Sequence, residues 1–213
     1  MKKNTFVSII MVLFLSVLMT NCKNVNNEPV PSRTNQNIQK RDVSLVNKLI
    51  NDNDFVACNA NMMNVYKLVS NRVFTMTKQE ATTWLQEKNN LPSDASLETR
   101  LALYPISKVD YIKQMDEAYT NFEKVLVKYP ELKNLSSSEY KDTMNGAFDI
   151  LNQEEAQQIL TRGGCWGQFL ADVRNLIADV RDLIRAGQPK ERIAEFALVL
   201  FENAVGNLLN CKD

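Results

Sequence analysis

The feature that most restricts the fold is a seven-residue repeat near the C-terminus. Residues 171–177 read ADVRNLI and residues 178–184 read ADVRDLI, so the two units differ at one position of seven. In a helix these spacings place valine, leucine and isoleucine on one face, with charged residues along its two borders. The repeat therefore predicts an amphipathic α-helix whose apolar face is covered by another helix. The charged residues on its borders are Asp172, Arg174, Asp179 and Arg181.

A partner for this helix follows directly in the sequence. Gly187 provides a helix stop, and Pro189 is a favourable first residue for the next helix. Apolar residues at helical spacing then continue to about Leu209. We expect residues 165–211 to form an antiparallel helical hairpin.

The preceding part of the chain shows the same helical periodicity. Thr77 and Glu80 form a capping box, and Ser107 precedes a long apolar stripe that ends before Pro130. No run of alternating β-branched residues between turn signals predicts a strand. With 45% hydrophobic residues the chain can bury a core. We expect an all-α, multi-helix bundle of about six to eight helices across residues 42–213.

Two of the cysteines stand at the ends of the expected hairpin. Its helices have similar lengths, so an antiparallel arrangement brings Cys165 and Cys211 together, and we expect a disulfide between them. Cys58 is then a buried thiol; the alternative is that Cys58 pairs with one of the other two. No pair of cysteines has the C-x-x-C spacing of a metal site, so no bound metal or cofactor is expected.

The composition excludes several classes of function. The chain has no histidine, which removes Ser-His-Asp and Cys-His catalysis, histidine-ligated metals and imidazole pH switches. The 25 basic and 25 acidic residues give a formal charge of zero, whereas nucleic-acid-binding proteins carry a basic excess or stripe. No catalytic constellation is recognisable in the sequence. We therefore expect a protein that is not an enzyme and that binds no nucleic acid.

The N-terminus carries an export pattern. Lys2 and Lys3 precede an apolar run from Phe6 to Met19, which is shorter than the roughly 20 residues that a membrane-spanning helix needs. Such a run is typical of a secretory signal peptide. It ends in the sequence LMTNC, residues 18–22, which resembles the lipobox of bacterial lipoproteins.

The resemblance has definite implications for processing and location. It implies that residues 1–21 are a signal peptide and that Cys22 becomes the lipidated first residue of the mature protein. Lys23 occupies the position at which an aspartate would imply retention at the inner membrane, so the outer membrane of a bacterial cell envelope is favoured. The membrane is then a partner of the protein through its N-terminal lipid.

Residues 22–41 separate the lipid from the domain. They are rich in asparagine and contain prolines and few bulky apolar side chains. A segment of this composition cannot bury enough apolar surface to fold by itself, so we expect a flexible tether. Residues 42–213 form the helical domain that the tether carries.

These features predict a lipid-anchored protein of the cell envelope that acts as a non-enzymatic binding or interaction module. The expected contact surface is the charged border of the repeat helix together with the loop at Trp166, and the expected partner is an envelope protein. Charged residues on both sides of an apolar stripe favour docking in one orientation. Packing of the same stripe within the domain is the competing interpretation. The candidate surface residues are Trp166, Asp172, Arg174, Asp179 and Arg181.

Two other functions stay open at the level of the sequence. Gly163-Gly164 follows an acidic amphipathic segment, as in double-glycine leaders, and a cut after Gly164 would release residues 165–213 as a bacteriocin-like helical peptide. The second alternative is an envelope hydrolase with an unrecognised acidic site. Neighbouring glutamates at the starts of predicted helices could supply such a site, but they also stabilise the positive end of a helix dipole.

Overall fold

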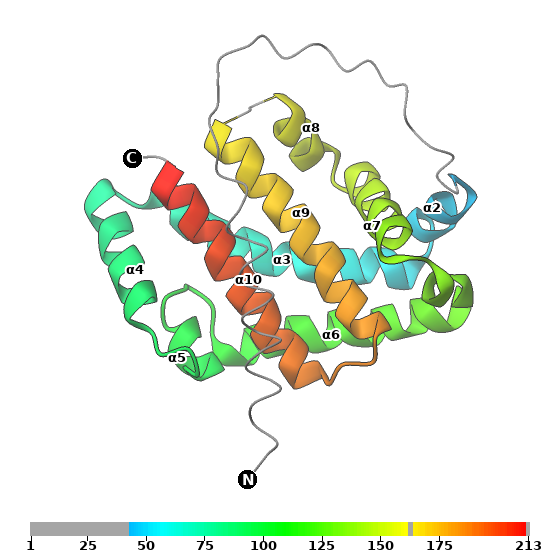
Figure 1. Ribbon diagram of the computed structural model, residues 1–213, viewed down its shortest axis with the longest axis horizontal. Coiled ribbons are helices and arrows are strands. Elements are labelled where there is room, and N and C mark those ends of the chain that lie inside the picture. The colour runs from blue at the N-terminus through cyan, green and yellow to red at the C-terminus, as the bar shows by residue number, and fades with distance from the viewer. Residues whose placement is uncertain (1–42, 162–163, 212–213) are drawn as a thin grey trace. The chain divides into compact units, whose positions relative to one another are not determined.

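The computed structural model describes residues 43–161 and 164–211, which form helices joined by short loops (Figure 1). Nine α-helices and one 3₁₀ segment occur in these ranges, and no strand does. The predicted all-α bundle is therefore confirmed; the helix beyond the expected number is the five-residue α5. The elements are α2 (Val43–Ile50), α3 (Asn53–Thr75), α4 (Lys78–Asn90), α5 (Leu97–Leu101), α6 (Lys108–Lys128), η1 (Pro130–Asn134), α7 (Ser137–Leu151), α8 (Gln153–Thr161), α9 (Gly164–Arg185) and α10 (Lys190–Cys211).

Side-chain caps determine where several helices begin. Thr77 and Glu80 form the predicted capping box at the start of α4, and Ser107 caps α6. Asp52 caps α3 by accepting hydrogen bonds from backbone N–H groups of its first turn. Gly187, with a φ of +71°, follows the end of α9 in the left-handed conformation that glycine adopts without strain.

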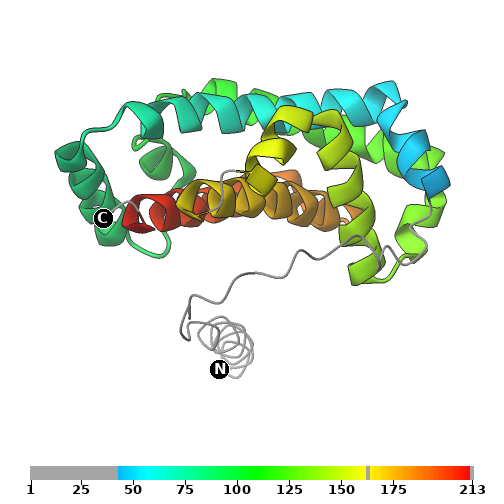
Figure 2. The same ribbon diagram turned by 90° about the horizontal axis from the view of Figure 1, so that it is seen from above.

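Two antiparallel helix pairs form the centre of the domain. α3 packs along α6, and α9 packs along α10. Figure 2 shows these pairs as two layers, with α3 and α6 on one side and α9 and α10 on the other. α4 and α5 lie at one end of the layers, and α2 and α7 lie at the other. The predicted C-terminal hairpin is thus one half of the central core.

The apolar face of the repeat helix is used within this core. Val173, Ile177 and Val180 of α9 are at most 2% exposed. The ring of Tyr66 on α3 lies 6.0 Å from that of Phe169 on α9, which joins the two layers. The apolar stripe of the repeat therefore packs inside the domain, as the competing interpretation predicted.

A disulfide closes the C-terminal hairpin. Cys165 in the first turn of α9 is bonded to Cys211 at the end of α10, with 5.5 Å between their Cα atoms. Cys58 on α3 is a buried free thiol. The predicted pairing is present in the structure, and the alternative pairing with Cys58 is not.

Candidate functional site

A surface cleft, called the α4–α5 cleft below, lies between α4 and the residues that directly follow α5, at one end of the domain. It has a volume of about 400 Å³, which is within the range of pockets that bind small molecules. Trp84, the buried residue of α4, forms part of an apolar wall, and the rest of the lining is largely polar. The residues that line the cleft are Met76, Thr77, Gln79, Glu80, Thr83, Trp84, Glu87, Ala102 and Leu103.

The lining of this cleft contains carboxylates but no basic side chain. Glu80 is committed to the capping box, where its carboxylate accepts hydrogen bonds from the backbone N–H and the hydroxyl of Thr77. Glu87 is exposed at the rim. Trp84 packs edge-on against Tyr104, with 5.9 Å between the ring centres. An aromatic wall beside a carboxylate suits an organic cation, because both groups attract positive charge.

Polar contacts to α10 hold this end of the domain in place. Arg100 of α5 donates from Nη1 to Oε2 of Glu202 at 2.7 Å, and Lys88 of α4 donates to Asn203 at 3.3 Å. Other N–H groups of Arg100 donate to backbone carbonyls in the α4–α5 connection. The sequence did not predict this ion pair, because Glu202 stands alone among apolar residues and its partner is 102 positions away.

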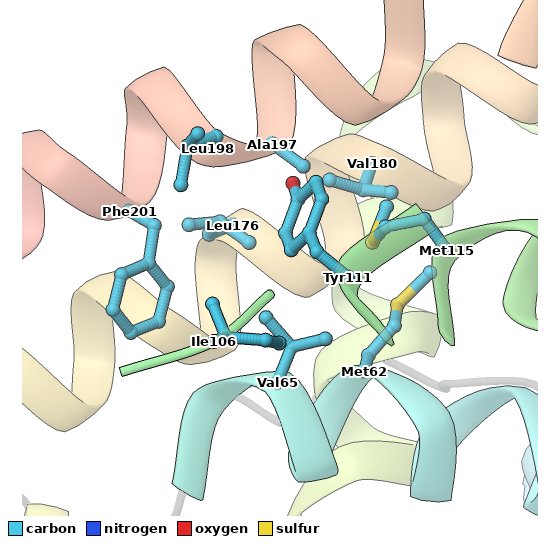
Figure 3. Close-up of a pocket in the computed structure, with 10 residues that line it drawn as sticks. All are labelled: Met62, Val65, Ile106, Tyr111, Met115, Leu176, Val180, Ala197, Leu198 and Phe201. Carbon is cyan, nitrogen blue, oxygen red and sulfur yellow. The ribbon is translucent and has the colours of Figure 1, made fainter. Parts of the chain in front are cut away.

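A second cavity lies inside the domain, where α3, α6, α9 and α10 meet (Figure 3). Its volume is about 30 Å³, roughly the space of one water molecule. The hydroxyl of Tyr111 donates to the backbone carbonyl of Ala194 at 2.7 Å and so has a partner already. This cavity is too small and too apolar to recognise a ligand. Its lining residues are Met62, Val65, Ile106, Tyr111, Met115, Leu176, Val180, Ala197, Leu198 and Phe201.

The polar border of α9 docks onto α7. Arg174 forms an ion pair with Asp149 at 3.1 Å, and Asp179 forms one with Lys141 at 3.1 Å. Two of the predicted surface residues, Arg174 and Asp179, therefore hold α7 against α9 within the domain. All four side chains keep partial exposure, so each pair contributes little to stability by itself.

Arg181 is completely buried, so its predicted place on an interaction surface is wrong. Its guanidinium carbon lies 4.5 Å from the centre of the Phe55 ring, and Nη2 donates to Oδ1 of Asn59 at 3.0 Å. The reason is the neighbouring helix: Phe55 and Asn59 of α3 cover this turn of α9, whereas α7 lies beside the equivalent residue Arg174. Arg174 lies at the border of the helix face, whereas Arg181 points into the core.

Trp166 and Asp172 lie near the start of α9 and keep partial exposure. The Trp166 ring packs against Phe169 with 5.2 Å between ring centres, and Asp172 accepts a hydrogen bond from Gln168 at 2.8 Å. Neither Trp166 nor Asp172 lines the α4–α5 cleft. The predicted surface and the cleft are therefore separate features.

The predicted lipidation site Cys22, the segments 1–21 and 22–41, and Gly163 lie outside the described residues. Within the described ranges, none of the helices combines the length and the apolar character of a membrane span. The same ranges contain no group of three or more cysteine, aspartate or glutamate side chains arranged to hold a metal ion. The chain matches no protein-family model, no curated protein and no solved structure.

Proposed function

We propose that the protein is a lipid-anchored, non-enzymatic binding module of the bacterial cell envelope and that it binds its ligand in the α4–α5 cleft. The proposed binding site rests on one observation, the cleft of about 400 Å³ with Trp84 in its wall. The lipid anchor follows from the lipobox resemblance at Cys22, and the outer membrane is its favoured location. A flexible tether of this length has a typical reach of roughly 25 Å, enough to separate the domain from the lipid headgroups.

The lining favours a ligand that joins a positively charged group to an apolar part. Glu87 supplies negative charge at the rim, and Trp84 supplies an aromatic wall. A cation beside a tryptophan ring gains about 0.5–1 kcal/mol at an exposed site. Small organic amines carry such a group, and so do basic side chains of an envelope protein.

The contacts inside the domain give less support to the two alternatives. Among the described residues Glu202 is the carboxylate whose pKa is raised, mainly by burial, but it is 2% exposed and paired with Arg100. A hydrolase substrate would not reach it. Release of residues 165–213 would remove Phe169 and Ile177 from the core between the layers and expose the apolar faces of α3 and α6.

Fluorescence of Trp84 tests the binding site directly, because Trp84 and Trp166 are the two tryptophans of the chain. In a Trp166→Phe background, titration with phenethylamine should change the Trp84 emission and reach saturation. Phenethyl alcohol, which has the same ring and chain but no charge, should bind more weakly.

A pair of charge variants provides the control. Glu87→Gln removes a carboxylate from the rim and should weaken phenethylamine binding about 5-fold, equivalent to roughly 1 kcal/mol. Glu131→Gln on η1, which does not line the cleft, should leave the affinity unchanged. The proposal fails if phenethylamine and phenethyl alcohol give the same response or if neither saturates.

A further inference from the structure

Arg181 is a buried cation without a carboxylate partner among residues 43–161 and 164–211. It is 0% exposed, and its guanidinium carbon lies 4.5 Å from the centre of the Phe55 ring and 6.0 Å from that of the Phe122 ring. Its Nη2 donates to the neutral amide of Asn59. No described carboxylate forms an ion pair with Arg181. By contrast, Arg100, Arg174 and Arg185 are each paired with a carboxylate.

The polar atoms left without partners around Arg181 are donors. Nε and Nη1 of Arg181 have no hydrogen-bond partner among the described residues, and neither does the hydroxyl of Tyr140 on α7. A guanidinium has no acceptor and stays protonated in proteins. Burial raises the pKa of Tyr140, and the nearby charge of Arg181 opposes this rise only in part. The phenol of Tyr140 is therefore also protonated. The region therefore offers several N–H and O–H groups without partners, and no described carboxylate is paired with them.

Neighbouring groups do not supply the missing negative charge. Burial raises the pKa of the Cys58 thiol. The positive charge of Arg181 and a hydrogen bond between the two side chains offset this rise only in part, so Cys58 is a neutral thiol. Asp182, the next residue in the chain, is paired with Arg185 at 2.6 Å. Arg185 also covers the ring of Tyr140, at 4.1 Å, and adds further positive charge to this region.

We propose that Arg181 and Tyr140 form an internal binding site for a small inorganic anion, with chloride as the occupant. An isolated charge buried away from water costs several kcal/mol unless it is paired. Chloride accepts hydrogen bonds from several donors at once and neutralises the guanidinium, whereas a water molecule accepts at most two and carries no charge. Phe55, Phe122 and Tyr140 are at most 1% exposed, like Arg181 itself, so an occupant has to be compact, which favours a small ion over an organic ligand.

Bromide replaces chloride and is located by its anomalous scattering. Because the site is closed, the protein should be prepared and crystallised in bromide from the first purification step. The expected result is an anomalous peak at hydrogen-bond distance from Arg181, with Nε or Nη1 and the Tyr140 hydroxyl directed at it. A structure with water molecules alone beside Arg181, and no anomalous peak there, would overturn the proposal.

Thermal unfolding gives an independent test in solution. At constant ionic strength, replacing gluconate with chloride should raise the melting temperature of the intact chain by about 3 °C, because a ligand that binds only the folded state stabilises it. Arg181→Met removes the charge at similar length and should abolish this chloride dependence. Arg185→Met, on the same helix and beside the same tyrosine, should retain it. If Arg181→Met does not fold, the wild-type comparison still decides, and equal melting in both salts contradicts the proposal.

Discussion

Arg100 on α5 and Glu202 on α10 form an ion pair with 2.7 Å between Nη1 and Oε2. The Glu202 side chain is 2% exposed and that of Arg100 is 13% exposed, so the pair lies under the surface of the domain. It joins the α4–α5 end of the molecule, which contains the candidate cleft, to the C-terminal helix of the core. Stability of the cleft therefore depends on a residue far away in the sequence.

Removal of the Glu202 side chain should lower the free energy of unfolding. Glu202→Ala leaves Arg100 without its carboxylate in a poorly solvated position, and breaking a buried pair in this way costs about 3 kcal/mol. Urea unfolding should show this loss. Glu98→Ala breaks the exposed pair with Lys108 and should cost less than about 0.5 kcal/mol. Similar losses for both variants would contradict the assigned role of the buried pair.

The α4 end should open more readily than the centre of the domain. α4 buries Trp84 alone, whereas α6 buries residues along its whole length. Segments with few buried apolar contacts open at lower free energy. Hydrogen exchange followed by mass spectrometry should therefore show faster exchange for residues 78–90 than for residues 111–126. Equal protection of the two segments would show that α4 is an integral part of the core.

Asp52 should make the stability depend on pH in the acid range. Burial acts to raise its pKa, but hydrogen bonds from Lys128 and from the backbone N–H of Phe55 outweigh burial and leave the pKa below 3.8. A carboxylate whose pKa is lower in the folded state than in the unfolded state stabilises the fold at pH values above its unfolded-state pKa. This stabilisation is lost as the pH falls through the folded-state pKa.

The substitution Asp52→Asn isolates this contribution, because asparagine still caps α3 but cannot pair with Lys128. Above about pH 5 the free energy of unfolding of the wild type should exceed that of the variant by about 1 kcal/mol. This difference should shrink below about pH 4. In a Lys128→Met background the Asp52→Asn difference should be smaller, because the ion pair is already absent. An Asp52→Asn difference that is constant across this range would refute the assignment.

Loss of the disulfide should lower stability substantially. The bond between Cys165 and Cys211 spans 46 positions, and closing a loop of this size adds about 4 kcal/mol when the effect is treated as chain entropy. Reduction should shift the urea midpoint of the wild-type chain to lower concentration. The double variant Cys165→Ser/Cys211→Ser should unfold at this lower midpoint and should not respond to reductant. A wild-type midpoint that is insensitive to reductant would exclude a contribution from this bond.

Local signals in the sequence were sufficient for the helical fold. The capping box at Thr77, the cap at Ser107 and the stop at Gly187 each depend on residues close together in the chain, so their patterns predict the helix ends. The pairing of Cys165 with Cys211 was also predictable, because the two helices between them have equal length.

Features that depend on distant packing were not predictable. Arg174 and Arg181 occupy equivalent positions of the repeat, but one pairs with Asp149 at the surface of α7 and the other is buried against Phe55. The cleft is formed by α4 and the residues that directly follow α5, and the contact between Arg100 and Glu202 holds α5 against α10. A single sequence contains no periodic signal for such contacts.

The intact mass of protein extracted from membranes, with and without reduction, tests the central claim most directly. The predicted result is residues 22–213 plus the mass of acyl chains, with a gain of two hydrogen atoms on reduction of the Cys165–Cys211 bond. A Cys22→Ser variant should lose the acyl mass and leave the membrane fraction. An unlipidated chain that still carries residues 1–21, or a separate species of residues 165–213, would contradict the account of an anchored binding domain.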